Sequence, residues 1–216
     1  MRPLTLEEMR HFLSLVEGER SAPLYALAAG LGLRQSELLG LAWPDVDLER
    51  GTLTIRRSLQ RYDGEYHLDE VKSQRSRRTL ALPPPLVDAL GRQRTLQLEE
   101  RLKAAPQWEG DQWELVFATE AGAPLSAKAV TRAFKKDLKA AGLPEKRFHD
   151  LRHGAATYAL SLGVPLKVVQ DILGHSTIAI TADTYSHIAD ELQRDATDRI
   201  TAGLWGAPTT QARARG

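Results

Sequence analysis

The sequence predicts a mainly helical protein with one small antiparallel β-sheet inserted early in the chain, an α+β fold. Apolar residues recur at helical spacing over most of the chain, and glycines and prolines mark the expected helix ends. The stretch 51–82 instead shows the period of two that strands require. Of the 216 residues, 42% are hydrophobic and 26% charged, which is ordinary for a globular protein.

Three short helices are expected first. They cover 5–18, 23–31 and 36–43. Thr5 and Glu8 have the spacing of a capping box, which predicts the start of the first helix. Gly32 is expected to end the second helix, and Ser36 is the candidate N-cap of the third.

The strands follow. Residues 52–55 and 78–82 are β-rich, and Asp63-Gly64 between them is a hairpin turn signal, so about three strands are expected from 51 to 82. A long helix is expected over 84–104 and a short strand over 115–118.

Helices then return over 126–141, 150–162 and 165–173, with Gly142, Gly163 and Gly174 as stop signals. The last helix is expected over 188–204. It carries apolar residues at four-residue spacing, namely Ile188, Leu192, Ala196, Ile200 and Leu204. This stripe is expected to pack against its own domain or against a neighbouring subunit. Residues 1–205 are predicted to form one domain, and residues 206–216 a disordered tail.

Charge and composition narrow the function only partly. The formal net charge is +1, but seven Lys/Arg face four Asp/Glu between residues 56 and 78, and eight face three between 128 and 152. Such stretches suit phosphate binding, although a solvated face gives the same pattern. The absence of cysteine excludes disulfides, thiolate metal sites and a cysteine nucleophile. No signal-peptide or membrane-spanning run is recognisable, so an intracellular, cytoplasmic protein is expected.

The residues with chemical potential gather between 149 and 187. His149 and Arg152 lie three residues apart at a predicted helix start, so both can face one point. His175, Tyr185 and His187 follow. Three histidines could hold a metal, but residue types of this kind match ligand motifs by chance too often to establish a site. Taken singly, each histidine could equally be a polar residue near a helix end.

Four segments occur in a characteristic order: G-L-R-Q-S-E-L-L-G-L-A-W-P-D-V-D, K-S-Q-R-S-R-R-T-L-A-L, H-D-L-R-H-G and L-G-H-S-T-I-A-I-T-A-D-T-Y-S-H. Together they resemble the successive signature blocks of the tyrosine recombinases, the phage integrase family. The resemblance runs from Leu4 to His187, and Tyr185 lies ten positions after His175, as in the family pattern. It implies the DNA breaking–rejoining catalytic-domain fold and the activity of a site-specific recombinase.

Six positions match the family's active residues: Arg34, Lys72, His149, Arg152, His175 and Tyr185. The resemblance implies that Tyr185 is the nucleophile, which attacks a DNA phosphate and forms a 3′-phosphotyrosine link. It implies that the two arginines hold the phosphate oxygens, with Lys72 as general acid.

The histidines are expected to share the remaining roles, with His149 assisting proton removal and His175 donating a hydrogen bond to the phosphate. Other interpretations exist for single residues. Arg34 could pair with Glu37 or cap a helix, and only the family pattern selects Lys72 over Arg75. Glu37 and Asp150 are interpreted as residues that orient arginine or histidine side chains.

The resemblance also implies partners. It implies double-stranded DNA as substrate, a tetramer on that DNA, no metal, ATP or other cofactor, and a bacterial, nucleoid-associated protein of a mobile element. The N-terminal DNA-binding domain usual in the family is expected to be absent. Three alternatives compete: a DNA-binding module that no longer cuts, a type IB topoisomerase, and a metal-dependent hydrolase.

Overall fold

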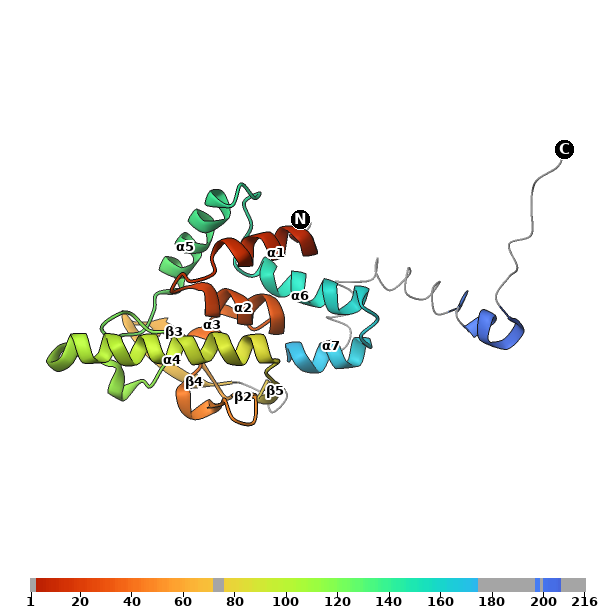
Figure 1. Cartoon of the computed structure of the whole chain (residues 1–216). Helices are drawn as coiled ribbons and strands as arrows, with labels where there is room; N and C mark the ends of the chain where they lie inside the picture. The colour runs from red at the N-terminus through yellow and green to blue at the C-terminus, as the bar shows by residue number, and fades with distance from the viewer. Residues whose placement is uncertain (1–2, 72–75, 175–196, 199, 207–216) are drawn as a thin grey trace.

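The computed structural model describes the chain except residues 1–2, 72–75, 175–196, 199 and 207–216 (Figure 1). The α-helices are α1 (Leu6–Leu15), α2 (Ala22–Leu31), α3 (Gln35–Leu39), α4 (Pro84–Ala104), α5 (Ala127–Ala140), α6 (Asp150–Ser161) and α7 (Leu166–Leu173). The strands are β1 (Val46–Asp47), β2 (Thr52–Ile55), β3 (Arg57–Tyr62), β4 (Glu65–Glu70) and β5 (Arg78–Ala81). Short 3-10 helices lie at Trp43–Asp45, Ala105–Gln107 and Gly110–Gln112. In the view of Figure 1, α1, α2, α5 and α6 lie on one side of α4, and β2, β4 and β5 on the other.

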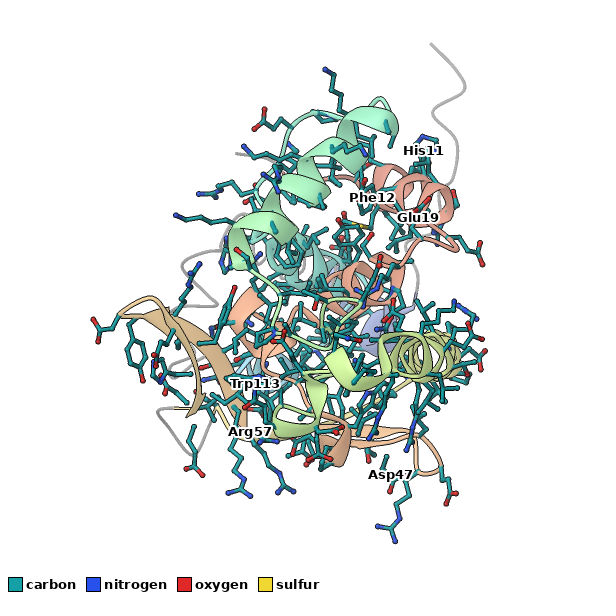
Figure 2. The ribbon with its side chains drawn as sticks, turned by 90° about the vertical axis from the view of Figure 1, so that its left-hand side faces the viewer. His11, Phe12, Glu19, Asp47, Arg57 and Trp113 are labelled. Carbon is teal, nitrogen blue, oxygen red and sulfur yellow. The ribbon has the colours of Figure 1, made fainter. Side chains whose placement is uncertain are left out.

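Local capping explains where α1 starts. The Glu8 amide donates to Thr5 Oγ1 (3.1 Å), and the Thr5 amide donates to Glu8 Oε2 (2.6 Å), so the predicted capping box is confirmed. Phe12 points to the inner side of α1, whereas His11 lies at its outer edge (Figure 2). The helix therefore presents one apolar face to the core.

An aromatic cluster joins the helical layer. Phe12, Tyr25, Phe134 and Phe148 make ring contacts with centroids 5.3 to 6.3 Å apart, in tilted or edge-on geometry. Such arrangements stabilise more than their buried area alone provides. The Tyr25 hydroxyl donates to Asp137 on α5 (2.9 Å), so its polar end is also satisfied. This cluster fixes α1, α2 and α5 around the chain that leads into α6.

The strands form two sheets, and the expectation of one sheet with about three strands was wrong. β1, β2 and β5 form a three-stranded antiparallel sheet, while β3 pairs with β4 alone. The predicted turn at Asp63-Gly64 is confirmed, with both residues at positive φ. β3 diverges from β2 because it lies against α3: a Cβ on Gly40 would approach the Leu59 amide nitrogen to 2.7 Å. Only glycine permits this contact.

Two further expectations were wrong. Residues 115–118 form isolated bridges and no strand, because side-chain amides of Gln97 and Gln93 on α4 donate to the carbonyls of Leu115 and Val116. The predicted third helix, 36–43, is shorter than expected: α3 begins at Gln35 and ends at Leu39, and its N-cap is Arg34 rather than Ser36.

The other predicted helices are confirmed within a few residues. α4 has the predicted bounds, and Gly142, Gly163 and Gly174 all have positive φ after helix ends. Residues 200–205 are helical, and Ile200 and Leu204 are exposed. Residues 197–198 of the predicted 188–204 helix are helical too, whereas residues 188–196 and 199, and the tail from 207, lie outside the described residues. Among the described helices, none combines the length and apolar character needed to cross a membrane.

Candidate active site

Arg34 lies at the junction of α2 and α3. Gly32 ends α2 in the left-handed conformation (φ 62°), which reverses the chain and makes Arg34 the N-cap of α3. The cap is formed by Glu37, whose Oε2 accepts from the Arg34 amide (2.9 Å). The same carboxylate accepts from Arg34 Nη1 (2.7 Å). The Arg34 side chain remains 37% exposed, so it is held on one side and faces solvent on the other.

Glu37 is the buried centre of this arrangement. Only 3% of its side chain is exposed, and it receives two guanidiniums, those of Arg34 and Arg78. Arg78 Nη1 and Nη2 donate to the two carboxylate oxygens at 3.2 and 2.9 Å. Burial alone would raise the pKa of Glu37, but Arg78 and then Arg34 outweigh it and hold the pKa below its ordinary value. Glu37 is therefore ionised at neutral pH and orients both arginines, as predicted for Arg34.

Arg152 joins the ends of two helices. Its Nη1 donates to the Gly32 carbonyl (2.7 Å) and its Nη2 to the Leu173 carbonyl (2.8 Å), so it lies between the C-termini of α2 and α7. Carbonyl ends of helices carry partial negative charge that a guanidinium stabilises. The two ends are so close that a Cβ on Gly32 would approach Leu173 Cδ2 to 2.5 Å.

Three arginine side chains donate hydrogen bonds to three successive backbone carbonyls at the end of α7. Arg78 Nε donates to Ile172 (2.7 Å), Arg152 to Leu173 and Arg34 Nη2 to Gly174 (3.1 Å). The last carbonyls of a helix have no partner within the helix, so external donors satisfy them. Residues far apart in sequence thus place three positive charges around one helix end. We call Arg34, Arg78 and Arg152 with Glu37 the arginine collar.

His149 lies beside this cluster as the N-cap of α6. Its ring contacts that of His153 edge-on, with centroids 4.8 Å apart. Desolvation by surrounding side chains, then His153 and the positive charge of Arg152, lower the pKa of His149 below its ordinary value. At neutral pH the ring is therefore uncharged and able to accept a proton.

Asp150 was predicted to orient an arginine or histidine, and its bonds go to Arg147. The carboxylate accepts from the Arg147 amide (2.8 Å) and from Arg147 Nη2 (2.9 Å). Burial raises the pKa of Asp150, but the Arg147 bonds outweigh it and lower that pKa below its usual range. Asp150 therefore stabilises the turn that enters α6, on which His149 and Arg152 depend.

Comparison with known proteins identifies the family. The sequence profile described as the phage integrase family matches residues 2–191. The chain belongs to the phage integrase family. It is 37% identical over 204 residues to a XerC-like tyrosine recombinase of Caldanaerobacter subterraneus subsp. tengcongensis, covering 90% of this chain and 52% of that protein. It is also 29% identical to an integrase of Saccharopolyspora erythraea, in an alignment that covers 95% of this chain and 58% of that protein.

Solved structures of tyrosine recombinases and integrases share the fold. The Tn1549 transposon integrase in complex with transposon right end DNA is 28% identical, with a TM-score of 0.79, over 93% of this chain and 66% of that one. XerA recombinase, at 23% identity, shows the same fold with a TM-score of 0.72, over 93% of this chain and 65% of that one. The chain spans about half the length of the curated relatives that it matches.

Within this family, three of the six predicted active residues lie in the described part of the chain. Arg34 lies at the start of α3, and His149 and Arg152 lie at the start of α6; the structure brings the two arginines onto the end of α7. Lys72, His175 and Tyr185 lie outside the described residues. Lys72 belongs to the connection between β4 and β5. No cluster of metal-ligating side chains occurs among the residues that the structure describes.

Sequence reasoning missed one member of the collar, Arg78. The signal was present in the strand pattern. Arg78 lies two residues before Leu80, so it shares the inward face of β5, where a leucine is buried. A charged residue on the buried face of a strand needs a partner, and Glu37 is that partner.

Proposed function

We propose that residues 1–205 form the catalytic domain of a site-specific tyrosine recombinase, which cuts and rejoins DNA without metal or ATP. The observation that carries this proposal is the meeting of Arg34 and Arg152 on adjacent carbonyls at the end of α7. Guanidiniums are suited to the non-bridging oxygens of a phosphodiester, because their planar fork stays charged at any working pH. Family membership and the match to DNA-bound integrase structures support the same conclusion.

In the proposed reaction, the phenolic oxygen of Tyr185 attacks the phosphorus of a DNA strand. The bond from phosphorus to the 5′-oxygen breaks as the new phosphotyrosine bond forms, so the number of phosphate esters is unchanged. Tyr185 loses its proton, for which the uncharged ring of His149 is the acceptor, and Lys72 protonates the departing 5′-oxygen. Arg34, Arg152 and His175 stabilise the charge that builds on the phosphate oxygens.

Rejoining is the reverse of this reaction on a partner strand. The energy of the cleaved ester is retained in the phosphotyrosine, so a 5′-hydroxyl can displace Tyr185 with no other energy source. Because recombination needs four cuts in two duplexes, we propose a tetramer on DNA. The apolar stripe within 188–204 is its proposed contact with a neighbouring subunit. We further propose that the protein acts in the bacterial cytoplasm on nucleoid DNA.

The test is covalent trapping on nicked duplex substrates in excess chelator. Loss of a short fragment beyond the nick prevents rejoining, so a DNA–protein adduct accumulates and is resolved on denaturing gels. We expect the adduct to map to Tyr185 by peptide mass analysis and to disappear in Tyr185→Phe. Tyr158→Phe is the control: it removes the hydroxyl of another tyrosine, which lies on α6, donates to the Leu4 carbonyl and is not the proposed nucleophile. An adduct that requires added divalent metal, or one that persists in Tyr185→Phe, would overturn the proposal.

Covalent trapping, together with a plasmid relaxation assay, distinguishes a recombinase from a type IB topoisomerase. A recombinase should yield adducts from a restricted set of sequences and leave supercoiled plasmid largely unrelaxed. Relaxation of any plasmid, without sequence dependence, would identify the topoisomerase.

A further inference from the structure

Arg78 has an environment unlike that of an ordinary surface arginine on a strand. Its side chain is 7% exposed and makes four hydrogen bonds. Two go to the Glu37 carboxylate, one to the Ile172 carbonyl and one to the Ser76 carbonyl (3.0 Å). A buried charge with this many partners is fixed in one geometry.

The partners of Arg78 are also the partners of Arg34. Glu37 binds Arg34 through the amide and Nη1 of that residue, while Arg78 occupies both oxygens of the same carboxylate. At the other end, Arg78 holds the Ile172 carbonyl, two residues before the Gly174 carbonyl that Arg34 holds. Arg78 thus contacts both groups that bind the Arg34 guanidinium, namely the Glu37 carboxylate and the end of α7.

The close contact with α7 is supported by a second observation. Gly174 has φ 68°, and a Cβ at this position would lie 2.6 Å from Arg78 Nη1. The guanidinium therefore packs closely against the backbone of the helix end.

We propose that Arg78 is a positioning residue for DNA cleavage, which fixes Arg34 through Glu37 and fixes the end of α7 through the Ile172 carbonyl. This inference rests on the proposed recombinase function. Arg78 does not meet the phosphate itself. It sets the distance and angle at which Arg34 meets the phosphate, and a misplacement of about 1 Å in such a group can cost about 100-fold in rate.

The decisive variant is Arg78→Lys. Lysine keeps the charge and most of the length, but its single ammonium cannot bridge both oxygens of Glu37 and the Ile172 carbonyl in a fixed fork. Arg20→Lys is the matched control, because Arg20 also binds a carboxylate through two donors (Glu100, 2.7 and 2.9 Å) but contacts no part of α7 in any hydrogen bond described. Urea unfolding of both variants measures any general loss of fold.

With the trapped substrate, we expect Arg78→Lys to cleave about 10- to 100-fold more slowly at saturating DNA, with near-normal DNA affinity, and Arg20→Lys to cleave at the normal rate. A methylphosphonate at the scissile position removes the charge that Arg34 holds. On that substrate the difference between Arg78→Lys and the unaltered protein should largely vanish. An equal loss on both substrates would indicate a general structural fault and overturn the positioning role, as would a normal rate on the ordinary substrate.

A second measurement needs neither DNA nor activity. In ¹⁵N-labelled protein, rotation of the Arg34 guanidinium is slowed by its bonds to Glu37 and Gly174, and the NMR signal is assigned by its loss in Arg34→Lys. We expect faster rotation in Arg78→Lys and no change in Arg20→Lys. An Arg34 signal unaltered by Arg78→Lys would refute the inference. If the unaltered protein forms no adduct while Arg34 loosens as expected, the proposed function fails and the structural coupling stands.

Discussion

Glu37→Gln tests whether the buried carboxylate organises the arginine collar. Glutamine has the same shape, but it removes the negative charge and replaces one acceptor oxygen with an amide donor. That donor would face the N–H groups of Arg78 or Arg34, so at least one buried hydrogen bond becomes a contact between two donors.

The size of the effect follows from the two ion pairs. In the Arg78–Glu37 pair the side chains are 7% and 3% exposed, and breaking a buried pair of this kind costs about 3–5 kcal/mol. The Arg34 pair is partly exposed and therefore screened, so it adds at most about 1 kcal/mol. For a chain of this size, a loss of about 3–5 kcal/mol lowers the melting temperature by about 6–20 °C.

The assay is urea unfolding followed by circular dichroism, with thermal unfolding in parallel. Glu145→Gln is the control, because Glu145 pairs with Lys135 at the surface and its loss should leave the unfolding midpoint unchanged. A Glu37→Gln variant as stable as the Glu145→Gln control would refute the reasoning that a buried, doubly paired carboxylate holds the site together.

The pH dependence of the same variant provides a further check. The pKa of Glu37 is lowered in the folded state, so its contribution to stability is fully present above its ordinary value of 4.5 and is lost as the pH falls through the lower folded value. The stability difference between the unaltered protein and Glu37→Gln should therefore shrink below pH 4.5. A difference that stays constant down to the acid transition would contradict the assignment.

Three more predictions concern single residues. NMR titration should show a pKa of His149 below its ordinary value of 6.5. Because the unfolded chain binds the proton more readily, the stability that this ring contributes is present above 6.5 and is lost as the pH falls from 6.5 through the lower folded value. A His149 titration above 6.5 would remove the basis for its role as proton acceptor. Gly40→Ala should destabilise the protein by about 1–3 kcal/mol, because its Cβ would lie 2.7 Å from the Leu59 amide nitrogen. In the control Gly91→Ala, in α4, the Cβ meets open space, so this variant should be neutral or stabilising. Urea midpoints that rank the two variants the other way would be inconsistent with the packing of β3 on α3. Phe134→Ala should cost about 3–5 kcal/mol, since its ring is fully buried and contacts three other aromatic rings, and a loss below about 1 kcal/mol in urea unfolding would show that the cluster is not a centre of stability.

Local chemistry in the sequence was sufficient for most of the helical frame. The capping box at Thr5, the bounds of α4 and the glycine stops at 142, 163 and 174 all depend on contacts within a few residues. Such contacts can be recognised from spacing alone, because cap residues and left-handed glycines act within a single turn. The family motifs likewise depend on residue identity and order, and they pointed to Arg34, His149 and Arg152 before any geometry was known.

Expectations that depended on a choice between neighbouring residues, or on distant partners, were less accurate. The Ser36 cap was wrong because Glu37 and the Arg34 amide form a better one, a choice between neighbours that spacing does not settle. The stretch 115–118 has strand-like residues, but two glutamines of α4 take its carbonyls. The division of the strands into two sheets depends on the contact of β3 with α3, which lies outside the strand sequences themselves.

The sequence by itself determined the helical frame, the family and the residue types of the site. Only the tertiary structure decided that Glu37 and Arg78, 41 residues apart, share a buried ion pair, and that Arg78 and Arg152 meet successive carbonyls of α7. The physical reason is that hydrogen bonds and ion pairs between distant segments form only after the core has set those segments side by side. No local spacing records which carbonyl a guanidinium will meet.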